Sequence, residues 1–330
     1  MKKTLTIISI IVFTFLAINS IAKAEVKVVV SIKPIHSLAS YVMDGVGEPD
    51  IIVDGYNSPH NFSLKPSHAK MIEKANLIIW VGEDLETFLE KPLKTISKDA
   101  VNVEIMDLKG IKKLKFREKN IFEGHDDHGH GHKEHKEHGH DEHKEHGHKE
   151  KKHDDHGHEG HAHGKYDPHV WLDPMNAKLI VKEIENQLVK LDPDNSLKYK
   201  ANSKKAQSEL DNLTKNIKKD LKKDLRFVVF HDAYQYFENR FGIKVLGALT
   251  VNPDVLPGAE QLSEIREVIE HEKVNCLFSE PQFNPAIIKS ISKDTKVKTG
   301  VLDPLGATLD KGKGMYNDLV SNMYASFKGC

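Results

Sequence analysis

Short runs of apolar, often β-branched residues alternate with helical patterns twice along this 330-residue chain. The first set reads VKVVVSI, DIIVDG, LIIWVG and VNVEIMDL, with helices expected near residues 36–45, 66–76 and 84–96. The second set reads RFVVF, IKVLGAL, VNCLFSE and KVKTGVL, with helices expected near residues 232–241, 258–272, 284–293 and 314–327. Because strands that alternate with helices pair in parallel, the pattern predicts an α/β fold with two lobes, each a mainly parallel four-stranded sheet.

A helical region, residues 174–223, separates the two sets and divides the chain into an N-terminal domain, residues 25–173, and a C-terminal domain, residues 224–330. Residues 196–223 contain no Gly or Pro, and their apolar positions follow one helical stripe. A helix of this length spans roughly 42 Å at 1.5 Å per residue. We therefore expect a long helix that bridges the two lobes.

The first 24 residues have the pattern of an export signal. Lys2 and Lys3 precede an apolar run, and small residues at Ala22 and Ala24 are typical of a cleavage site after Ala24. An uncleaved membrane anchor is the alternative, but polar Asn19 and Ser20 interrupt the apolar run. The sequence thus predicts a mature periplasmic protein without stable membrane insertion.

Charge and cysteine content narrow the classes of protein to which this chain can belong. The chain has 48 basic and 49 acidic residues, a balance that does not favour nucleic-acid binding. Cys276 and Cys330 are its two cysteines, and in an oxidising compartment they are expected to form one disulfide. Two free thiols are the alternative.

A histidine-rich tract occupies residues 124–164 and holds fifteen of the 21 histidines. Its composition of His, Asp, Glu, Lys and Gly cannot bury apolar surface, so a disordered loop is expected over residues 117–165. Crowded imidazoles bind borderline metals such as zinc, although a solvated or pH-responsive loop is the alternative. The expected weak, accessory metal ligands are His125, His128, His130, His132, His135, His138, His140, His143, His146, His148, His153, His156, His158, His161 and His163.

Three other histidines lie where a preformed site is expected. His60 follows a predicted strand in a loop, His169 lies in the proline-bounded segment DPHVWLDP, and His231 directly follows RFVVF. Ligands of open α/β sheets gather at the carboxyl ends of strands, so these side chains can meet in the cleft between the lobes. Each alone is more simply read as a hydrogen-bonded structural histidine, and their shared placement favours a joint metal site.

The segments SPHNFSLKPS, DPHVWLDP, VVFHDAYQYFENRFG, FSEPQFNP and GVLDPLG occur in this order. With them the chain resembles the zinc-binding substrate proteins of bacterial high-affinity zinc ABC uptake systems, of the cluster A-I metal-binding family, through essentially its whole mature length. The resemblance implies two α/β lobes bridged by a long helix, with zinc in the interdomain cleft. It also implies that His60, His169 and His231 are metal ligands, and that the partner is an inner-membrane ABC permease with a cytoplasmic ATPase.

The fourth ligand differs among members of this family. Asp303 in VLDPLG matches an acid that binds the metal or lies beside it, whereas Pro59 stands where some zinc proteins have Glu. Asp303 or a water molecule is therefore expected to complete the site, and a cap of the turn before Pro304 is the alternative role of Asp303. Three imidazoles with at most one carboxylate favour zinc over manganese, but ligand type does not exclude copper or nickel.

The remaining conspicuous side chains have simpler interpretations. His68 and His271 are expected at the surface, and the chain has no HExxH zinc-protease motif. His36 lies at a predicted strand-to-helix turn and is a candidate neighbour of the metal ligands. Trp171, two residues after His169, is a candidate shield of the metal from water.

These features together predict a monomeric zinc carrier and not an enzyme. A zinc hydrolase with three histidines and an activated water is one alternative, but the sequence offers no convincing general base or substrate pocket for it. A metal-dependent adhesin or a metal buffer is the second alternative. The histidine tract is expected to concentrate zinc near a tight site that lies elsewhere, since a flexible chain must be ordered at each binding event.

Overall fold

A computed structural model describes residues 25–122, 164–220, 225–253 and 255–330 of the chain. Its strands form two four-stranded sheets, with the orders β2-β1-β3-β4 and β6-β5-β7-β8, and all their pairings are parallel. The strands are β1 (Val28–Ile32), β2 (Asp50–Val53), β3 (Leu77–Trp80), β4 (Val101–Glu104), β5 (Arg226–His231), β6 (Lys244–Thr250), β7 (Cys276–Ser279) and β8 (Lys298–Val301). The predicted fold class is confirmed, because each run that was expected to form a strand contains one.

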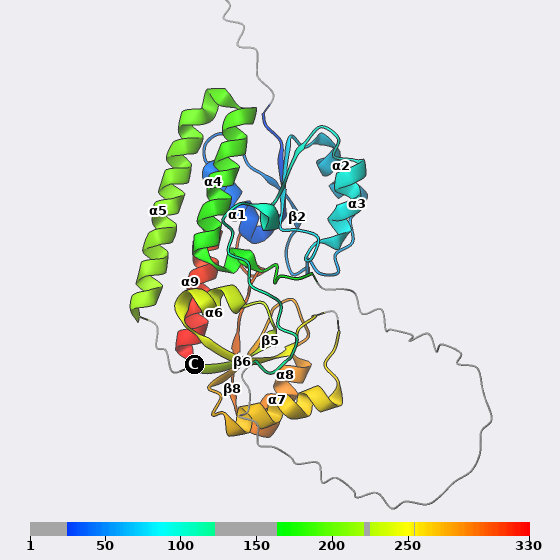
Figure 1. Ribbon diagram of the computed structural model, residues 1–330, viewed down its shortest axis with the longest axis vertical. Coiled ribbons are helices and arrows are strands. Elements are labelled where there is room, and N and C mark those ends of the chain that lie inside the picture. The colour runs from blue at the N-terminus through cyan, green and yellow to red at the C-terminus, as the bar shows by residue number, and fades with distance from the viewer. Residues whose placement is uncertain (1–24, 123–163, 221–224, 254) are drawn as a thin grey trace, which may run out of the picture.

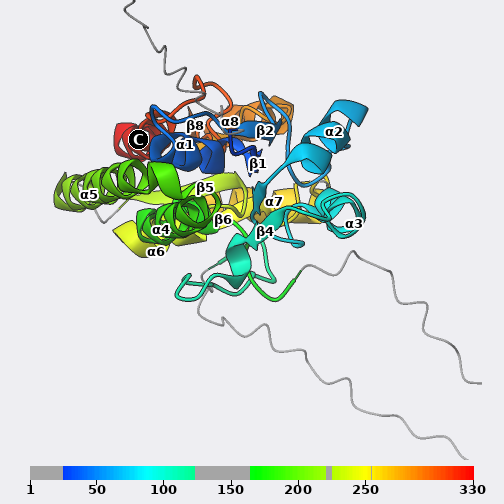
Figure 2. The same cartoon turned by 90° about the horizontal axis from the view of Figure 1, so that it is seen from above.

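Helices cover both sheets, and the two lobes lie one above the other in Figure 1. The helices are α1 (Lys33–Val42), α2 (Pro66–Lys74), α3 (Thr87–Thr95), α4 (Pro174–Leu191), α5 (Ser196–Asp220), α6 (Gln235–Phe241), α7 (Ala259–His271), α8 (Ala286–Thr295) and α9 (Met315–Gly329), with the short 3-10 turns η1 (Ile105–Asp107), η2 (Val170–Leu172) and η3 (Pro193–Asn195). Figures 1 and 2 show α1 and α4 on one side of the first sheet and α2 and α3 on the other. Among the described residues, no helix is long and apolar enough to cross a membrane.

The second sheet is buried on both faces, as the continuous apolar run of β5 predicts. Phe227 and Val229 point into a core cluster shared with α6 and α9, whereas Val228 and Phe230 point into a second cluster beneath α7 and α8. Successive side chains of a strand face opposite ways, so one strand supplies both cores. His231, the last residue of β5, is thereby held at the carboxyl end of an interior strand whose two faces are both packed.

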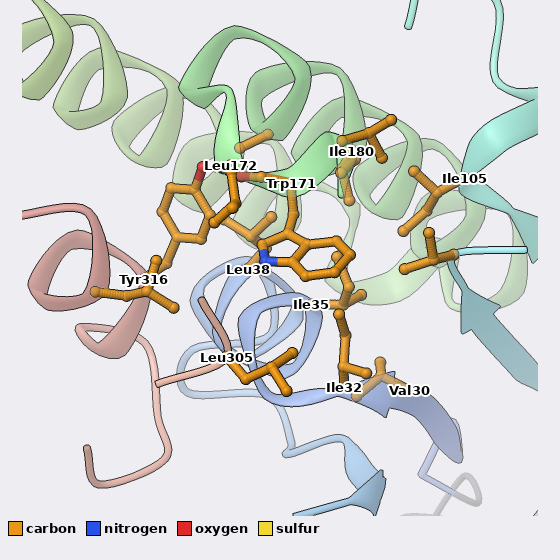
Figure 3. Packing of buried hydrophobic residues seen from close by; sticks show 14 of the residues in the cluster. Val30, Ile32, Ile35, Leu38, Ile105, Trp171, Leu172, Ile180, Leu305 and Tyr316 are labelled. Carbon is orange, nitrogen blue, oxygen red and sulfur yellow. Dashed lines mark hydrogen bonds between the residues drawn. The ribbon is translucent and has the colours of Figure 1, made fainter. Parts of the chain in front are cut away.

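One core cluster runs through both lobes. It joins residues of β1, α1, α4 and α5 to Phe227, Phe278 and Phe327 of the second lobe. Trp171 is fully buried in it, and Figure 3 shows its ring among Ile35, Leu38, Leu305 and other apolar side chains. Because the lobes share packed side chains, any wide opening between them would expose apolar core.

The long helix begins at Ser196 as expected, and the structure describes it to Asp220, while residues 221–224 lie outside the described part. It packs against α4, α1 and α9. Its buried stripe contains Thr214, whereas the neighbouring Leu213 is half-buried, and the Thr214 hydroxyl donates a hydrogen bond to the Leu210 carbonyl.

The start of the predicted disordered loop belongs to the folded protein, which corrects its boundary of residue 117. Residues 120–122 add an antiparallel segment to the edge strand β6, through Ala248 N to Asn120 O (2.9 Å) and Phe122 N to Leu246 O (2.8 Å). Arg117 makes ion pairs with Asp232 and Glu238 at 2.8 Å each. Composition alone missed this segment because backbone hydrogen bonds and only two apolar side chains, Ile121 and Phe122, attach it to the fold. The fifteen histidines of the tract, within residues 125–163, and the export signal, residues 1–24, lie outside the described residues.

Cys276 and Cys330 form the expected disulfide, with Cα atoms 5.8 Å apart. It ties the end of the chain, just after α9, to the first residue of β7. The buried stripe of α9 includes Tyr316, Leu319 and Phe327, which matches the predicted helical spacing.

Candidate metal centre

Three imidazoles converge where the two lobes meet. His60 comes from the loop between β2 and α2, His169 precedes η2, and His231 ends β5. One nitrogen from each ring lies within 4.8 Å of the corresponding nitrogens of the other two. The Nε2 atoms of His169 and His231 are 3.3 Å apart. The structure therefore brings together the three residues that their strand-end placement had singled out.

Local structure holds each histidine differently. His231 and His169 are each only 3% exposed, whereas His60 is half-buried on its loop. The His60 backbone N–H donates to the Ser58 hydroxyl at 3.3 Å, within a turn that follows Gly55 at φ +70°. His169 is followed by Val170, Trp171 and Leu172, all fully buried. Two of the imidazoles are thus fixed by core packing, and the third belongs to a more exposed segment.

Buried carboxylates orient the two fixed imidazoles. His169 Nδ1 lies 2.7 Å from Asp167 Oδ1, and His231 Nδ1 lies 2.8 Å from Glu280 Oε1. A carboxylate accepts, so each Nδ1 carries the proton and donates it, which leaves the Nε2 lone pair of each ring free to bind a metal. The Asp167 carboxylate also accepts the His169 backbone N–H at 2.9 Å.

The surroundings shift the pKa values of these groups in different directions. Burial, with a smaller effect of nearby His231, lowers the pKa of His169 well below its usual value. Burial also disfavours charge on His231, but the Glu280 carboxylate outweighs it and raises the pKa of His231. Burial raises the pKa of Asp167 to about 7, although the His169 N–H bond opposes this. A bound cation would favour the charged form of these buried carboxylates.

Apolar side chains surround the imidazoles. Pro59, Trp171, Phe283, Pro304 and Leu305 line the cavity together with the histidines. The free space in the cavity is about 10 Å³. A cavity needs about 10 to 15 Å³, measured in the same way, to hold one water molecule. In this conformation the cavity has room for an ion and not for an organic substrate.

Trp171 contributes to this wall in the way that its position suggested. Its ring centroid lies 5.2 Å from that of His169, and its Nε1 donates to the Pro304 carbonyl at 2.8 Å. Pro304 and Leu305 follow β8 of the second lobe, so the indole connects both sides of the cavity. The geometry is suited to excluding water from the imidazole nitrogens.

The structure does not bring Asp303 to the imidazoles. Its carboxylate accepts hydrogen bonds from Gln282 Nε2 at 3.0 Å, from the backbone N–H of Leu305 at 3.3 Å, and from Thr308 N and Oγ1 at 3.1 and 3.2 Å. Within the part of the chain that the structure describes, the group of potential ligands contains the three histidines and no carboxylate. In this structure Asp303 makes the hydrogen bonds of a turn cap, the alternative role, and also binds the cavity residue Gln282.

The other histidines lie elsewhere. His36 is buried, but its Nε2 lies 3.0 Å from the Pro49 carbonyl, and it lines a different cavity beside Lys311 and Lys313. It is therefore not a neighbour of the metal ligands. His68 Nδ1 accepts the Lys65 backbone N–H at the start of α2, and His271 is exposed at the end of α7.

Sequence reasoning did not single out Asp167 and Glu280, which orient the imidazoles. Signals for both were present. Asp167 lies two residues before His169, and Glu280 directly follows β7, the neighbour of β5 in the sheet. The rule that placed His231 at a strand's carboxyl end applies equally to Glu280.

The chain is similar to known proteins over nearly its whole length. A family model described as zinc-uptake complex component A, periplasmic (ZnuA), matches residues 28–330. The high-affinity zinc uptake system protein ZnuA of Brucella abortus (strain 2308) is 48% identical over 314 residues, which cover 94% of this chain and 93% of the relative.

Two solved structures share the fold. A crystal structure of ZnuA matches with a TM-score of 0.69 at 20% identity and covers 92% of this chain and 99% of that chain. The laminin-binding protein Lmb of Streptococcus agalactiae, described as bifunctional with adhesin and metal transporting activity, matches with a TM-score of 0.68 at 22% identity and covers the same shares. At these identities the likeness concerns the fold alone.

Proposed function

Because this chain belongs to the ZnuA family of periplasmic zinc-uptake components, we propose that it captures Zn²⁺ in the periplasm and delivers it for import. The relatives are named for high-affinity zinc uptake, and the chain spans almost their whole length. The ion is the cargo of the protein and leaves it again at the end of each cycle. The protein performs binding and not catalysis.

The spacing of the two fixed imidazoles is the observation that carries this proposal. Two nitrogens that each bind zinc at about 2.05 Å, at the tetrahedral angle of about 109°, are about 3.3 Å apart. The Nε2 atoms of His169 and His231 have this separation, 3.3 Å. The protein therefore holds half of a tetrahedral nitrogen site in place before the ion arrives.

His60 supplies the third nitrogen in this proposal. It lies within 4.8 Å of the other two, so a small inward movement of its half-buried loop completes a three-nitrogen site. Water or a carboxylate that turns toward the ion takes the fourth position. Such nitrogen ligands favour zinc over manganese, and ligand type does not exclude copper or nickel.

Delivery requires a partner at the membrane. We propose that the mature chain, released from its signal after Ala24, acts as a monomer and passes zinc to an inner-membrane ABC permease with a cytoplasmic ATPase. The shared core between the lobes supports release through local loop movement rather than a wide hinge opening.

The two alternative functions make different demands on the protein. A zinc hydrolase needs a substrate cavity beside the metal, and the free space here is only about 10 Å³. The only support for the adhesin alternative is the fold that this chain shares with Lmb. A shared fold does not establish a shared function.

Growth under zinc limitation tests the proposal. A strain that lacks the gene should grow poorly in zinc-depleted medium, and excess zinc should restore growth, because low-affinity uptake then suffices. Complementation with the wild-type chain and with His271→Ala, an exposed histidine, should restore growth equally, whereas His231→Ala should not. Normal growth of the deletion strain without added zinc would refute a role in high-affinity uptake, provided that the strain has no second uptake system.

A further inference from the structure

Lys33 is a buried lysine that the binding of the ion does not use. It is the first residue of α1, directly after β1, and its side chain is 6% exposed. Its Nζ donates to the carbonyl oxygens of Gly306 (2.9 Å), Ala307 (3.2 Å) and Leu309 (3.0 Å). An ammonium group has three protons, so all of its donors are directed at one short segment, residues 306–309.

This segment is the continuation of the cavity wall. Pro304 and Leu305 line the metal cavity, and the chain then turns at Gly306, where φ is +66°. A Cβ at Gly306 would lie 2.7 Å from Met315 Sδ, so the turn is closely packed against α9 as well. Holding residues 306–309 therefore also holds the wall that precedes them.

Lys33 also faces the loop that carries His60. Its Nζ lies 3.7 Å from Asp54 Oδ1, and Asp54 is the first residue after β2, where that loop begins. One ammonium group is thus shared between the chain that follows β8 and the start of the His60 loop. Both segments lead to residues that line the metal cavity, Pro59 and His60 in one and Pro304 and Leu305 in the other.

The energetics favour a fixed arrangement. Burial of an ammonium group is costly unless its protons are hydrogen-bonded, and bonds from a charged donor are stronger than neutral ones. Movement of residues 306–309 away from Lys33 would break three such bonds at once. The partly exposed pair with Asp54 adds little by itself.

We propose that Lys33 is a positioning residue which, by holding residues 306–309 beside the start of the His60 loop, keeps the metal cavity closed and slows the release of bound zinc. This inference rests on the proposed function, since it concerns the retention of the same ion. Lys33 does not touch the ion, and it acts through the wall formed by Pro304 and Leu305.

The test is the rate of zinc release from full-length mature protein, measured by stopped flow with excess chelator. Lys33→Met keeps most of the side-chain length and removes the donors. We expect release to accelerate by about tenfold or more, which is the loss of about 1.4 kcal/mol of the barrier, with one tight zinc still bound. Lys33→Arg keeps charge and donors and should restore release to within about threefold of wild type.

Lys313→Met is the matched control. Lys313 forms an ion pair with Asp44 at 2.7 Å, and the two residues are far apart in the sequence, as Lys33 and residues 306–309 are. Both side chains are about half exposed, and they line another cavity. It should release zinc at the wild-type rate. If Lys33→Met does not fold, Lys33→Gln removes the charge and one of the three donors and shortens the side chain, so release should still accelerate, by less than in Lys33→Met.

The outcomes separate the two ideas. Wild-type release from a folded Lys33→Met or Lys33→Gln protein overturns the role of Lys33 and leaves zinc capture intact. Equal acceleration in Lys313→Met also overturns it, because any lost lysine contact would then suffice. Absence of tight zinc binding in the wild-type protein refutes the proposed function itself.

Discussion

The residues that hold the imidazoles matter as much as the imidazoles themselves. Glu280 and Asp167 fix which nitrogen of His231 and His169 is free, so they set the direction from which an ion is bound. Partners of this kind typically contribute tenfold to a hundredfold in metal affinity.

Removal of one imidazole should abolish tight binding. His231→Ala in protein without residues 125–163 leaves two ligands, and we expect zinc affinity to fall by about a hundredfold or more in competition with a chelator. Asp303→Asn is the informative comparison, because its carboxylate is already used by Gln282, Leu305 and Thr308. The zinc affinity of Asp303→Asn should fall by about tenfold at most. A loss as large as that of His231→Ala would show that Asp303 turns to bind the ion.

Glu280→Gln should weaken zinc binding at high pH and move the fall in affinity to a lower pH. Glu280 raises the pKa of His231 above its usual 6.5, so protons compete with zinc for His231 already above pH 6.5, and affinity falls as the pH decreases through that range. The neutral amide lowers this pKa. At pH 8 the variant should bind zinc about tenfold more weakly, and its affinity should start to fall at a lower pH. Affinity measured at several pH values from 5.5 to 8 tests this, and a parallel decline in both proteins contradicts it.

At the scale of elements, the disulfide secures the end of the second lobe. The bond joins residues 54 positions apart, and closing a loop of this size stabilises the fold by about 4 kcal/mol in the chain-entropy estimate. The double change of Cys276→Ser and Cys330→Ser should lower the free energy of unfolding by about this amount in urea. Zinc affinity should stay within about threefold, since neither cysteine lines the cavity. Unchanged stability would mean that the bond adds nothing beyond the packing of α9.

At the scale of the whole molecule, the tight site and the histidine tract should be separable. Deletion of residues 125–163 removes the fifteen tract histidines and leaves His60, His169 and His231 in place. Calorimetry should then show one tight zinc and no weaker sites, because the tract pays an ordering cost that the folded site does not. A wild-type chain titrated alongside should show both classes. Loss of the tight site on deletion would place the function in the tract.

The sequence by itself determined the eight strands, the long helix and the three histidines. Each of these follows from local regularities, such as β-branched runs, helical spacing and the position of a residue at the end of a strand. Each of these patterns involves only a few neighbouring residues, so it can be recognised without knowledge of the rest of the chain.

Only the tertiary structure decided how the histidines are held and how the cavity is closed. Glu280 lies 49 positions from His231, and Gly306 lies 273 positions from Lys33. No local pattern encodes a contact between such distant segments. The hydrogen bonds of Asp303 have the same origin: its donors in the turn and on Gln282 become visible only when the chain after β8 has folded. Burial then lowers the pKa of His169, and the buried Glu280 carboxylate raises that of His231, because low polarity strengthens every interaction of a charge.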